Sequence, residues 1–309
     1  MGGVIEVNGL TKRYGRKTAV DDLCFTVRPG QVTGFLGPNG AGKTTTLRMI
    51  LGLDAPTGGT ATVGGVPFRD HPRGLRHAGA LLDAQQVHGG LTARAHLAAL
   101  SRSNRLPARR VDEVLAEVGL TEAARRRVGG FSLGMKQRLG IAAALLGDPP
   151  VLMFDEPING MDPEGVLWVR HLFRRLAAQG RTVFLSSHLM SEMENTADQL
   201  VVIGRGRLIA AESVRSFAAR GSRLRVVVRT PRTAELTEVL TRAGGRVEPD
   251  DGPGTDRLAV TGLPAERIGT LALDHRIVLH ELTTRSASLE EAFMEITADT
   301  VEYLAGQPR

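Results

Sequence analysis

Alternating and continuous apolar runs predict strands at the start of the chain. Residues 4–10 and 19–27 alternate apolar with polar side chains, and a turn at 28–30 leads into a continuous apolar run over 32–36. Alternation is typical of a half-buried antiparallel sheet, whereas a short continuous run is typical of a strand buried on both faces. The pattern predicts an antiparallel sheet that precedes a parallel core.

Helical spacing of apolar residues dominates the middle of the chain. From about residue 75 to 147 we expect a mainly helical insert, with Thr92 capping one helix and Gly119 ending another that begins near Pro107. Before this insert, Gly64 and Gly65 suggest a hairpin between short strands.

Buried strands and helices then alternate again. An apolar run over 151–154 predicts a buried strand, and Asp162-Pro163 begins an amphipathic helix that extends to Gly180. A strand over 182–186 and a hairpin over 200–211 complete a first domain, which we place at residues 1–218. Its fold class is α/β.

The pattern restarts after residue 219 and predicts a small α+β accessory domain over 219–309. Strands near 224–228, 247, 258–260 and 277–282 alternate with helices over 233–243 and from 264. This βαββαβ order builds a split-βαβ sandwich. A last amphipathic helix is expected over 288–296, and we find no chemistry in this domain.

Composition limits the classes of function. The chain has 309 residues, 42% hydrophobic residues and a single cysteine, Cys24, which we expect to be a buried inert thiol in its strand. No apolar run approaches the ~18 residues of a membrane span, and the first residues do not form a signal peptide, so we expect a cytoplasmic protein. The net charge of +6 comes mainly from arginines scattered over helix faces, which favours solvated surfaces over a nucleic-acid partner.

A glycine-rich turn between a strand and a helix supplies the first candidate chemistry. It matches GxxxxGK followed by Thr, with Thr45 next in the helix, and is read as a P-loop whose backbone N–H groups cradle phosphates. Lys43 would reach the β- and γ-phosphates and Thr44 would ligate Mg²⁺. The residues are Gly37, Pro38, Asn39, Gly40, Ala41, Gly42, Lys43 and Thr44.

Two acids after the buried strand over 151–154 supply the second half of the site. We assign Asp155 to hold Mg²⁺, and Glu156, one residue further, to act as general base or to position the attacking water. No NKxD motif for guanine is present, so ATP is favoured over GTP.

A further motif opens the apolar helix that follows residue 131. Ser132 is a plausible N-cap in the segment Phe131-Ser132-Leu133-Gly134-Met135. Here the chain resembles the ATP-binding subunits of ABC transporters, whose LSGGQ-type signature contacts ATP held by the partner subunit. Tyr14, residues 37–45, 132–138, 155–156 and 159–162, and His188 stand in that family's order.

The resemblance, over about residues 4 to 218, implies a P-loop NTPase fold of the ABC ATPase type and a role for each matching residue. Tyr14 would stack on adenine, and Ser132 with Gly134 would clamp the γ-phosphate in the other subunit. Asp162 would couple the two sites. His188 would contact the γ-phosphate and orient Glu156.

Two places depart from the family pattern. Leu133 replaces the first glycine of the signature and Met135 replaces its glutamine. At the Q-loop, which senses Mg²⁺ and the membrane partner, Asp83 stands at the expected position, with Gln85 and Gln86 just after it. These departures and the C-terminal extension look like the bacterial drug- and antibiotic-exporter branch, similar to the daunorubicin- and bacitracin-resistance ATPases.

The resemblance implies an ATP-hydrolysing subunit that dimerises head to tail, as a homodimer, at the inner face of the cell membrane. It would drive export of a small molecule (a drug, an antibiotic or a lipid-like compound) through a separate permease. The alternatives are a soluble ABC ATPase that acts on nucleic acid or ribosomes, and a small-molecule kinase.

Overall fold

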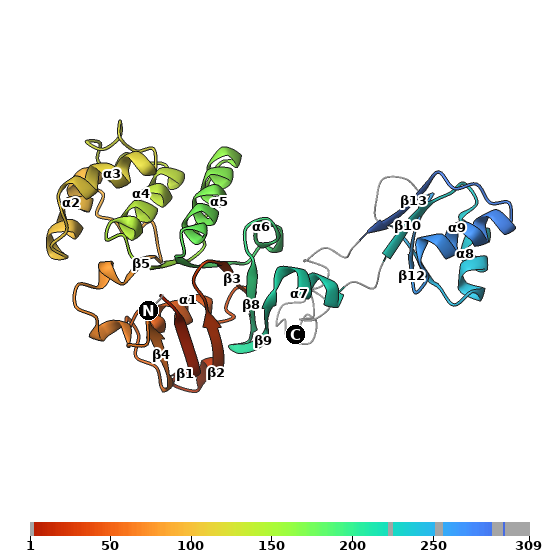
Figure 1. Cartoon of the computed structure of the whole chain (residues 1–309), viewed down its shortest axis with the longest axis horizontal. Coiled ribbons are helices and arrows are strands. Elements are labelled where there is room, and N and C mark those ends of the chain that lie inside the picture. The colour runs from red at the N-terminus through yellow and green to blue at the C-terminus, as the bar shows by residue number, and fades with distance from the viewer. Residues whose placement is uncertain (1–2, 222–224, 251–255, 286–292, 294–309) are drawn as a thin grey trace, which may run out of the picture. The chain divides into compact units, whose positions relative to one another are not determined.

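The computed structural model describes residues 3–221, 225–250, 256–285 and 293 (Figure 1). The chain divides into two compact units between Val214 and Arg215, and each unit is described by itself. The division falls at the start of helix α7 (Val214–Gly221), a few residues before the boundary expected from the sequence.

A six-stranded sheet forms the centre of the first unit. Its first five strands are parallel, and the last one pairs antiparallel with its neighbour. Every residue of β3 (Val32–Leu36), β6 (Val151–Phe154) and β7 (Thr182–Ser187) is buried, which agrees with their largely apolar sequences. The order is β5 (Ala78–Leu81), β6 (Val151–Phe154), β7 (Thr182–Ser187), β3 (Val32–Leu36), β8 (Gln199–Gly204) and β9 (Arg207–Ser213).

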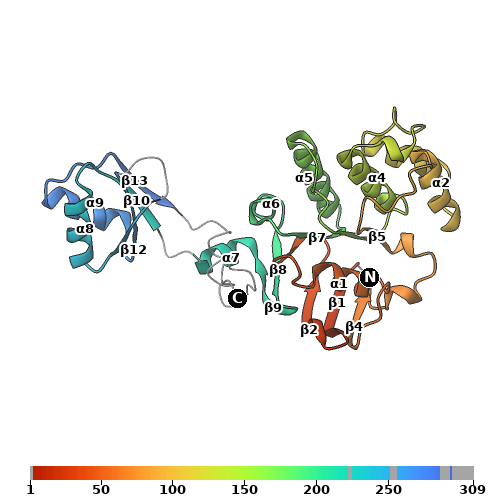
Figure 2. The same cartoon turned by 180° about the vertical axis from the view of Figure 1, so that it is seen from behind.

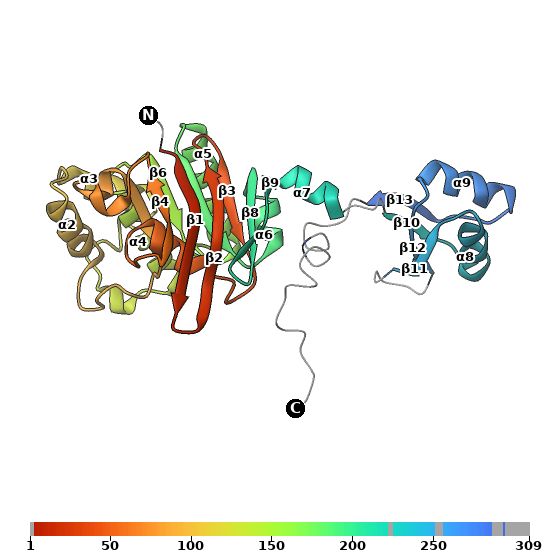
Figure 3. The ribbon, with the colours of Figure 1, turned by 90° about the horizontal axis from the view of Figure 1, so that it is seen from below.

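The predicted antiparallel sheet precedes this core and has the order β2-β1-β4. Its strands are β1 (Ile5–Tyr14), β2 (Lys17–Val27) and β4 (Gly58–Val63), and Figure 3 shows β1 and β2 as a long pair. Phe25 of β2 meets Phe35 and Phe184 of the central sheet, with ring centroids 5.7 and 5.8 Å away. The two sheets therefore share one core. Only an isolated bridge between Val63 and Val66 forms where a hairpin of two strands was expected.

The thiol of Cys24 was expected to be buried, and this prediction is wrong. Leu23 and Phe25 on either side of it are buried, and side chains alternate across a strand, so the thiol points to the opposite face and is exposed. Its Sγ accepts a hydrogen bond from the Gly9 amide at 3.1 Å.

The helical insert consists of α2 (Ala93–Ser103), α3 (Arg109–Glu117) and α4 (Leu133–Leu145), which gather together in both Figures 1 and 2. Thr92 caps α2 as predicted, because its side chain accepts a hydrogen bond from the Ala95 amide. The insert starts later than expected, since residues 78–81 form strand β5.

Three further helices flank the central sheet, and three short 3-10 turns lie in its connections. The helices are α1 (Lys43–Ile50), α5 (Pro163–Ala178) and α6 (Met190–Glu194), and the turns are η1 (Phe68–Asp70), η2 (Gly74–Arg76) and η3 (Val128–Gly130). Over the part of the chain that the structure describes, no helix has the length and apolar character needed to cross a membrane.

The second unit has the predicted βαββαβ order. Its sheet order is β11-β12-β10-β13, with every pair antiparallel, and α8 and α9 pack on one face around Val226, Val228, Leu258 and Val260. The last strand begins later than the predicted 277–282. The helix expected over 288–296 lies outside the described residues, except Phe293. The elements are β10 (Arg225–Arg229), α8 (Thr233–Arg242), β11 (Arg246–Pro249), β12 (Arg257–Thr261), α9 (Ala265–Asp274) and β13 (Glu281–Arg285).

Candidate active site

Three neighbouring parallel strands bring the candidate residues to one edge of the central sheet. The register pairs Leu36 at the end of β3 with Ser187 of β7, and Phe154 at the end of β6 with Leu185. The P-loop, Asp155-Glu156 and His188 follow these strand ends directly. The carboxyl edge of a parallel sheet is where such folds bind ligands.

The P-loop backbone requires glycine at specific points. Gly40 and Gly42 have φ values of 81° and 104°, in the left-handed region that side chains disfavour. A Cβ on Gly42 would also lie 2.6 Å from the Ala19 carbonyl oxygen, and one on Gly37 would lie 2.5 Å from that of Ile203. The loop therefore passes close to neighbouring backbone and leads into the N-terminus of α1, where backbone N–H groups attract anions.

Lys43 is the buried cation of the site, with 7% of its side chain exposed. Its Nζ donates a hydrogen bond to the Gly37 carbonyl at 2.6 Å and lies 3.8 Å from Glu156 Oε1. Burial lowers the pKa of the Lys43 ammonium group, and the charges of Glu156 and Asp155 partly oppose this shift.

Thr44 and Asp155 form an oxygen-rich corner beside the P-loop. The Thr44 hydroxyl donates to Asp155 Oδ2 at 2.5 Å, and the Ser186 hydroxyl donates to Asp155 Oδ1. Hydroxyl and carboxylate oxygens are the ligands that Mg²⁺ prefers. The donor set at Thr44 and Asp155 thus fits this ion.

Glu156 is held in an unusual backbone conformation, with a φ of 49°. Its amide donates to Ser186 Oγ at 2.9 Å, and its Oε2 lies 2.9 Å from His188 Nδ1. A carboxylate only accepts hydrogen bonds, so Nδ1 carries the proton in this contact. Non-glycine residues in the left-handed region often lie at functional sites.

A pocket of about 400 Å³ contains much of this network. Tyr14, half exposed at 50%, lies at the end of β1 on its wall, with the Lys12 ammonium 5.0 Å from the ring centre. The pocket joins an aromatic surface to the phosphate-type loop, which is the arrangement a nucleotide needs. Its lining residues are Tyr14, Lys17, Ala19, Pro38, Asn39, Gly40, Gly42, Lys43, Thr44, Thr45 and Glu156.

Eight predicted residues do not line this pocket: Gly37 and Ala41 of the P-loop, Asp155, His188, Asp83, Ser132, Gly134 and Asp162. Ser132 caps α4, and its Oγ accepts from the Met135 amide, while Gly134 lies beside the Gly160 carbonyl. Asp162 caps α5 by accepting from the Gly165 amide at 2.9 Å. Asp83 follows β5 at the same sheet edge, and its carboxylate accepts from the Gln85 amide at 2.8 Å. Their roles toward nucleotide or metal stay predictions.

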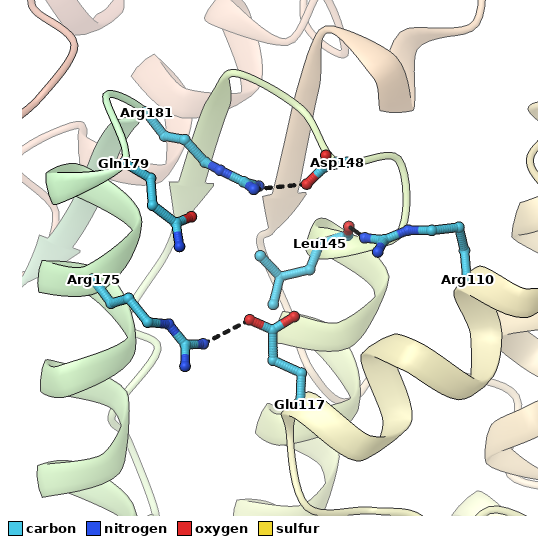
Figure 4. A pocket seen from close by; sticks show the side chains of 7 residues that line it. All are labelled: Arg110, Glu117, Leu145, Asp148, Arg175, Gln179 and Arg181. Carbon is cyan, nitrogen blue, oxygen red and sulfur yellow. Dashed lines mark hydrogen bonds and ion pairs between the residues drawn. The ribbon is translucent and has the colours of Figure 1, made fainter.

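A second pocket, of about 350 Å³, lies between α3, the end of α4 and α5. Figure 4 shows its arginines engaged with the protein itself: Arg175 with Glu117, Arg181 with Asp148, and Arg110 with the Leu145 carbonyl. The first two contacts connect the helical insert to α5 and to the start of β7, and the third joins α3 to α4 within the insert.

Sequence reasoning missed Ser186 as a site residue. It is fully buried and bonds both Asp155 and the Glu156 amide. Its position at the end of a strand next to Phe154-Asp155 could have revealed it, but only once β6 and β7 were known to be neighbours.

Comparisons with known proteins agree with this geometry. The family described as ABC transporter matches residues 20–159, and a domain of unknown function (DUF8746) matches 224–290. The uncharacterized ABC transporter ATP-binding protein YhcH of Bacillus subtilis is 36% identical over 307 residues, which cover 97% of each chain. The bacitracin transport ATP-binding protein BcrA of Bacillus licheniformis is 43% identical over 68% of this chain and 69% of its own.

Solved structures give the same fold. The structure of an ATP-binding subunit of an ABC transporter superposes with a TM-score of 0.64 at 28% identity, over 70% of this chain and 92% of the other. A dimeric bacterial ABC transporter cassette superposes with a TM-score of 0.63 at 22% identity, over 68% and 98% of the two chains.

The fold and the nucleotide-type site together define a P-loop ATPase. Since a relative at 36% identity spans nearly the whole chain, the protein belongs to the family of ABC transporter ATP-binding proteins. The predicted family and fold are thus confirmed.

Proposed function

We propose that this chain is the ATP-hydrolysing subunit of an exporter, and that the pocket of about 400 Å³ binds ATP. The observation that carries the proposal is the single network of Lys43, Glu156 and His188 beside the linked Thr44 and Asp155. It unites a phosphate-binding cation, a general base with its orienting partner, and an oxygen-rich corner.

Each residue has a defined task in this mechanism. Tyr14 stacks on adenine, and the P-loop N–H groups from Gly37 to Thr45 hold the phosphates. In the structure, Lys43 Nζ donates hydrogen bonds to the carbonyls of Gly37 and Pro38 in its own loop. When ATP binds, phosphate oxygens take the place of these carbonyls as acceptors. Glu156 takes the proton of the attacking water.

His188 keeps Glu156 pointing at the reacting water. Its Nδ1 donates to the Glu156 carboxylate. In this proposal the other ring nitrogen, Nε2, would face the γ-phosphate.

Thr44 and Asp155 would hold Mg²⁺, with Asp83 as the further candidate that senses it. The ion would neutralise charge on the phosphates. Within the described residues no cluster of three or more His, Cys, Asp or Glu side chains forms a metal site. Water and phosphate oxygens would supply the other ligands of the ion.

A second copy of the chain completes the site in this proposal. Ser132 and Gly134 lie outside the pocket of their own chain, and a head-to-tail homodimer would bring them to the γ-phosphate held by the partner. Asp162, beside the signature, would couple the two sites.

The cargo and the membrane partner are proposed from relatives. BcrA acts in bacitracin transport, and a protein of Ralstonia nicotianae, 41% identical over 67% of this chain and 66% of its own, is a Nod factor export ATP-binding protein. We infer export of a small molecule (a drug, an antibiotic or a lipid-like compound) through a separate permease, with this subunit at the inner face of the membrane and no role on nucleic acid.

Replacing Glu156 by Gln tests the proposal. The amide keeps the shape of the side chain but cannot accept the proton of water, so ATP should still bind while hydrolysis falls by about a hundredfold or more. ATP binding and phosphate release are measured on the same preparation.

The matched control is Glu164→Gln, the same change at an exposed position in the first turn of α5. It should hydrolyse ATP normally. Unchanged hydrolysis in Glu156→Gln would refute the assignment of the general base.

A further inference from the structure

The strained backbone of Glu156 is held by side chains at both of its polar groups. The amide donates to Ser186 Oγ at 2.9 Å, and the carbonyl accepts from Gln137 Nε2 at 3.4 Å. With a φ of 49°, the residue sits where a non-glycine backbone costs free energy. Contacts on both sides are what fix such a conformation.

Gln137 lies on α4, outside the ATP pocket, and only 6% of it is exposed. Its Nε2 also donates to the Asn159 carbonyl at 3.3 Å. One amide group therefore spans the turn that begins with Glu156 and leads to Asp162.

The other end of this amide has no partner. Gln137 Oε1 is buried and makes no hydrogen bond within the described part of the chain. A buried acceptor without a donor destabilises a fold. Gln137 is thus a poor choice for stability alone, and its value lies in what Nε2 holds.

The first turns of α4 contact the same segment a second time. A Cβ on Gly160 would lie 2.1 Å from Leu133 Cδ2, so the Leu133 side chain rests directly on this glycine. Leu133 stands where the family signature has glycine. Contacts from Leu133 and Gln137 therefore join the signature helix to the segment from Glu156 to Gly160.

We propose that Gln137 is a positioning residue for ATP hydrolysis: it holds the peptide group after Glu156 so that the carboxylate stays against Lys43 and His188. This inference rests on the proposed function, because it takes Glu156 as the general base. It also gives the signature helix, which begins at Ser132, a direct connection to the general base of its own chain.

Gln137→Met in the full-length chain tests the inference. Methionine keeps the length and fills the space, but it donates no hydrogen bond and removes the unpartnered Oε1. We expect kcat to fall by about tenfold or more, since small displacements of a reacting group are costly. The Kd for ATP should stay within about twofold and the Tm should be unchanged or higher.

The control is Gln179→Met, the same exchange at the exposed C-cap of α5, and its kcat should match wild type. A normal kcat in Gln137→Met would overturn the inference. A kcat that falls together with Tm and ATP affinity would also overturn it, because that pattern reports a structural role.

Glu156→Gln, measured in the same assays, distinguishes a failure of the proposed function from a failure of the inference about Gln137. If it hydrolyses ATP normally, the proposed function fails, whatever Gln137→Met does. If it is inactive while Gln137→Met is fully active, only the inference fails.

Discussion

Lys43 is an ammonium group whose neighbours only partly offset its loss of hydration. Burial lowers its pKa, so the folded chain disfavours the charged form. A lowered lysine pKa destabilises the fold most at pH values below the folded pKa. This cost disappears as the pH rises through the pKa of the unfolded chain, about 10.4.

Lys43→Met should therefore raise the Tm of the nucleotide-free protein at neutral pH and abolish ATP binding. The difference in Tm from wild type should shrink as the pH approaches that of an unfolded lysine. Thermal unfolding at several pH values measures the difference in Tm and its dependence on pH. Lys136→Met, at a lysine outside the pocket, serves as control. A lower Tm for Lys43→Met at neutral pH would contradict a net cost of burying the Lys43 charge.

At the residue scale, the sequence predicted side chains that a fixed motif specifies. The P-loop residues are consecutive in the sequence, and so are Asp155 and Glu156. The spacing within each motif is therefore enough to predict them. Ser186 and Gln137 reach Glu156 from other elements, at separations of 30 and 19 residues. Such partners depend on which strands and helices are neighbours, and spacing does not contain that information.

At the scale of elements, the backbones of α4 and β5 pack in close contact. A Cβ on Gly79 of β5 would lie 1.9 Å from the Ala144 carbonyl oxygen in α4. Because that atom is backbone, the two elements would have to separate. This close approach keeps the signature helix against the central sheet.

Gly79→Ala should lower the free energy of unfolding by about 3 kcal/mol, the upper part of the range for overpacked cores. Gly130→Ala adds the same methyl group where nothing lies within 4 Å, and should change it by less than about 0.5 kcal/mol. Urea unfolding measures both. Equal stabilities of the two variants would argue against the tight contact of α4 with β5.

Most elements were predictable because their apolar patterns are long or bounded by caps. The helix after Asp162-Pro163 and the βαββαβ order of the second unit are examples. Strand β5 was missed because its four residues, Ala78–Leu81, are too short to show a period and adjoin a helical region. Cys24 was misassigned because alternation gives the two faces of a strand without saying which is covered.

At the scale of the whole molecule, the order of the motifs along the first unit predicted the family. YhcH matches across both units, while BcrA matches over 68% of this chain. The second unit carries a buried apolar core that includes Val226, Val228, Leu258 and Val260. A fold of this kind does not specify a function by itself.

We propose that each ATP site is completed by Ser132 of another copy of the chain. Ser132→Arg and Lys43→Met should each be inactive as homodimers, the first through a blocked signature and the second through a lost phosphate contact. In a mixed dimer, the intact P-loop of one chain would meet the intact signature of the other.

The most direct test is therefore ATP hydrolysis by an equal mixture of Ser132→Arg and Lys43→Met. Activity should recover to about a quarter of the wild-type value, because about half of the dimers are mixed and each mixed dimer has one complete site. A mixture no more active than the sum of the separate variants would contradict completion of the site by another copy.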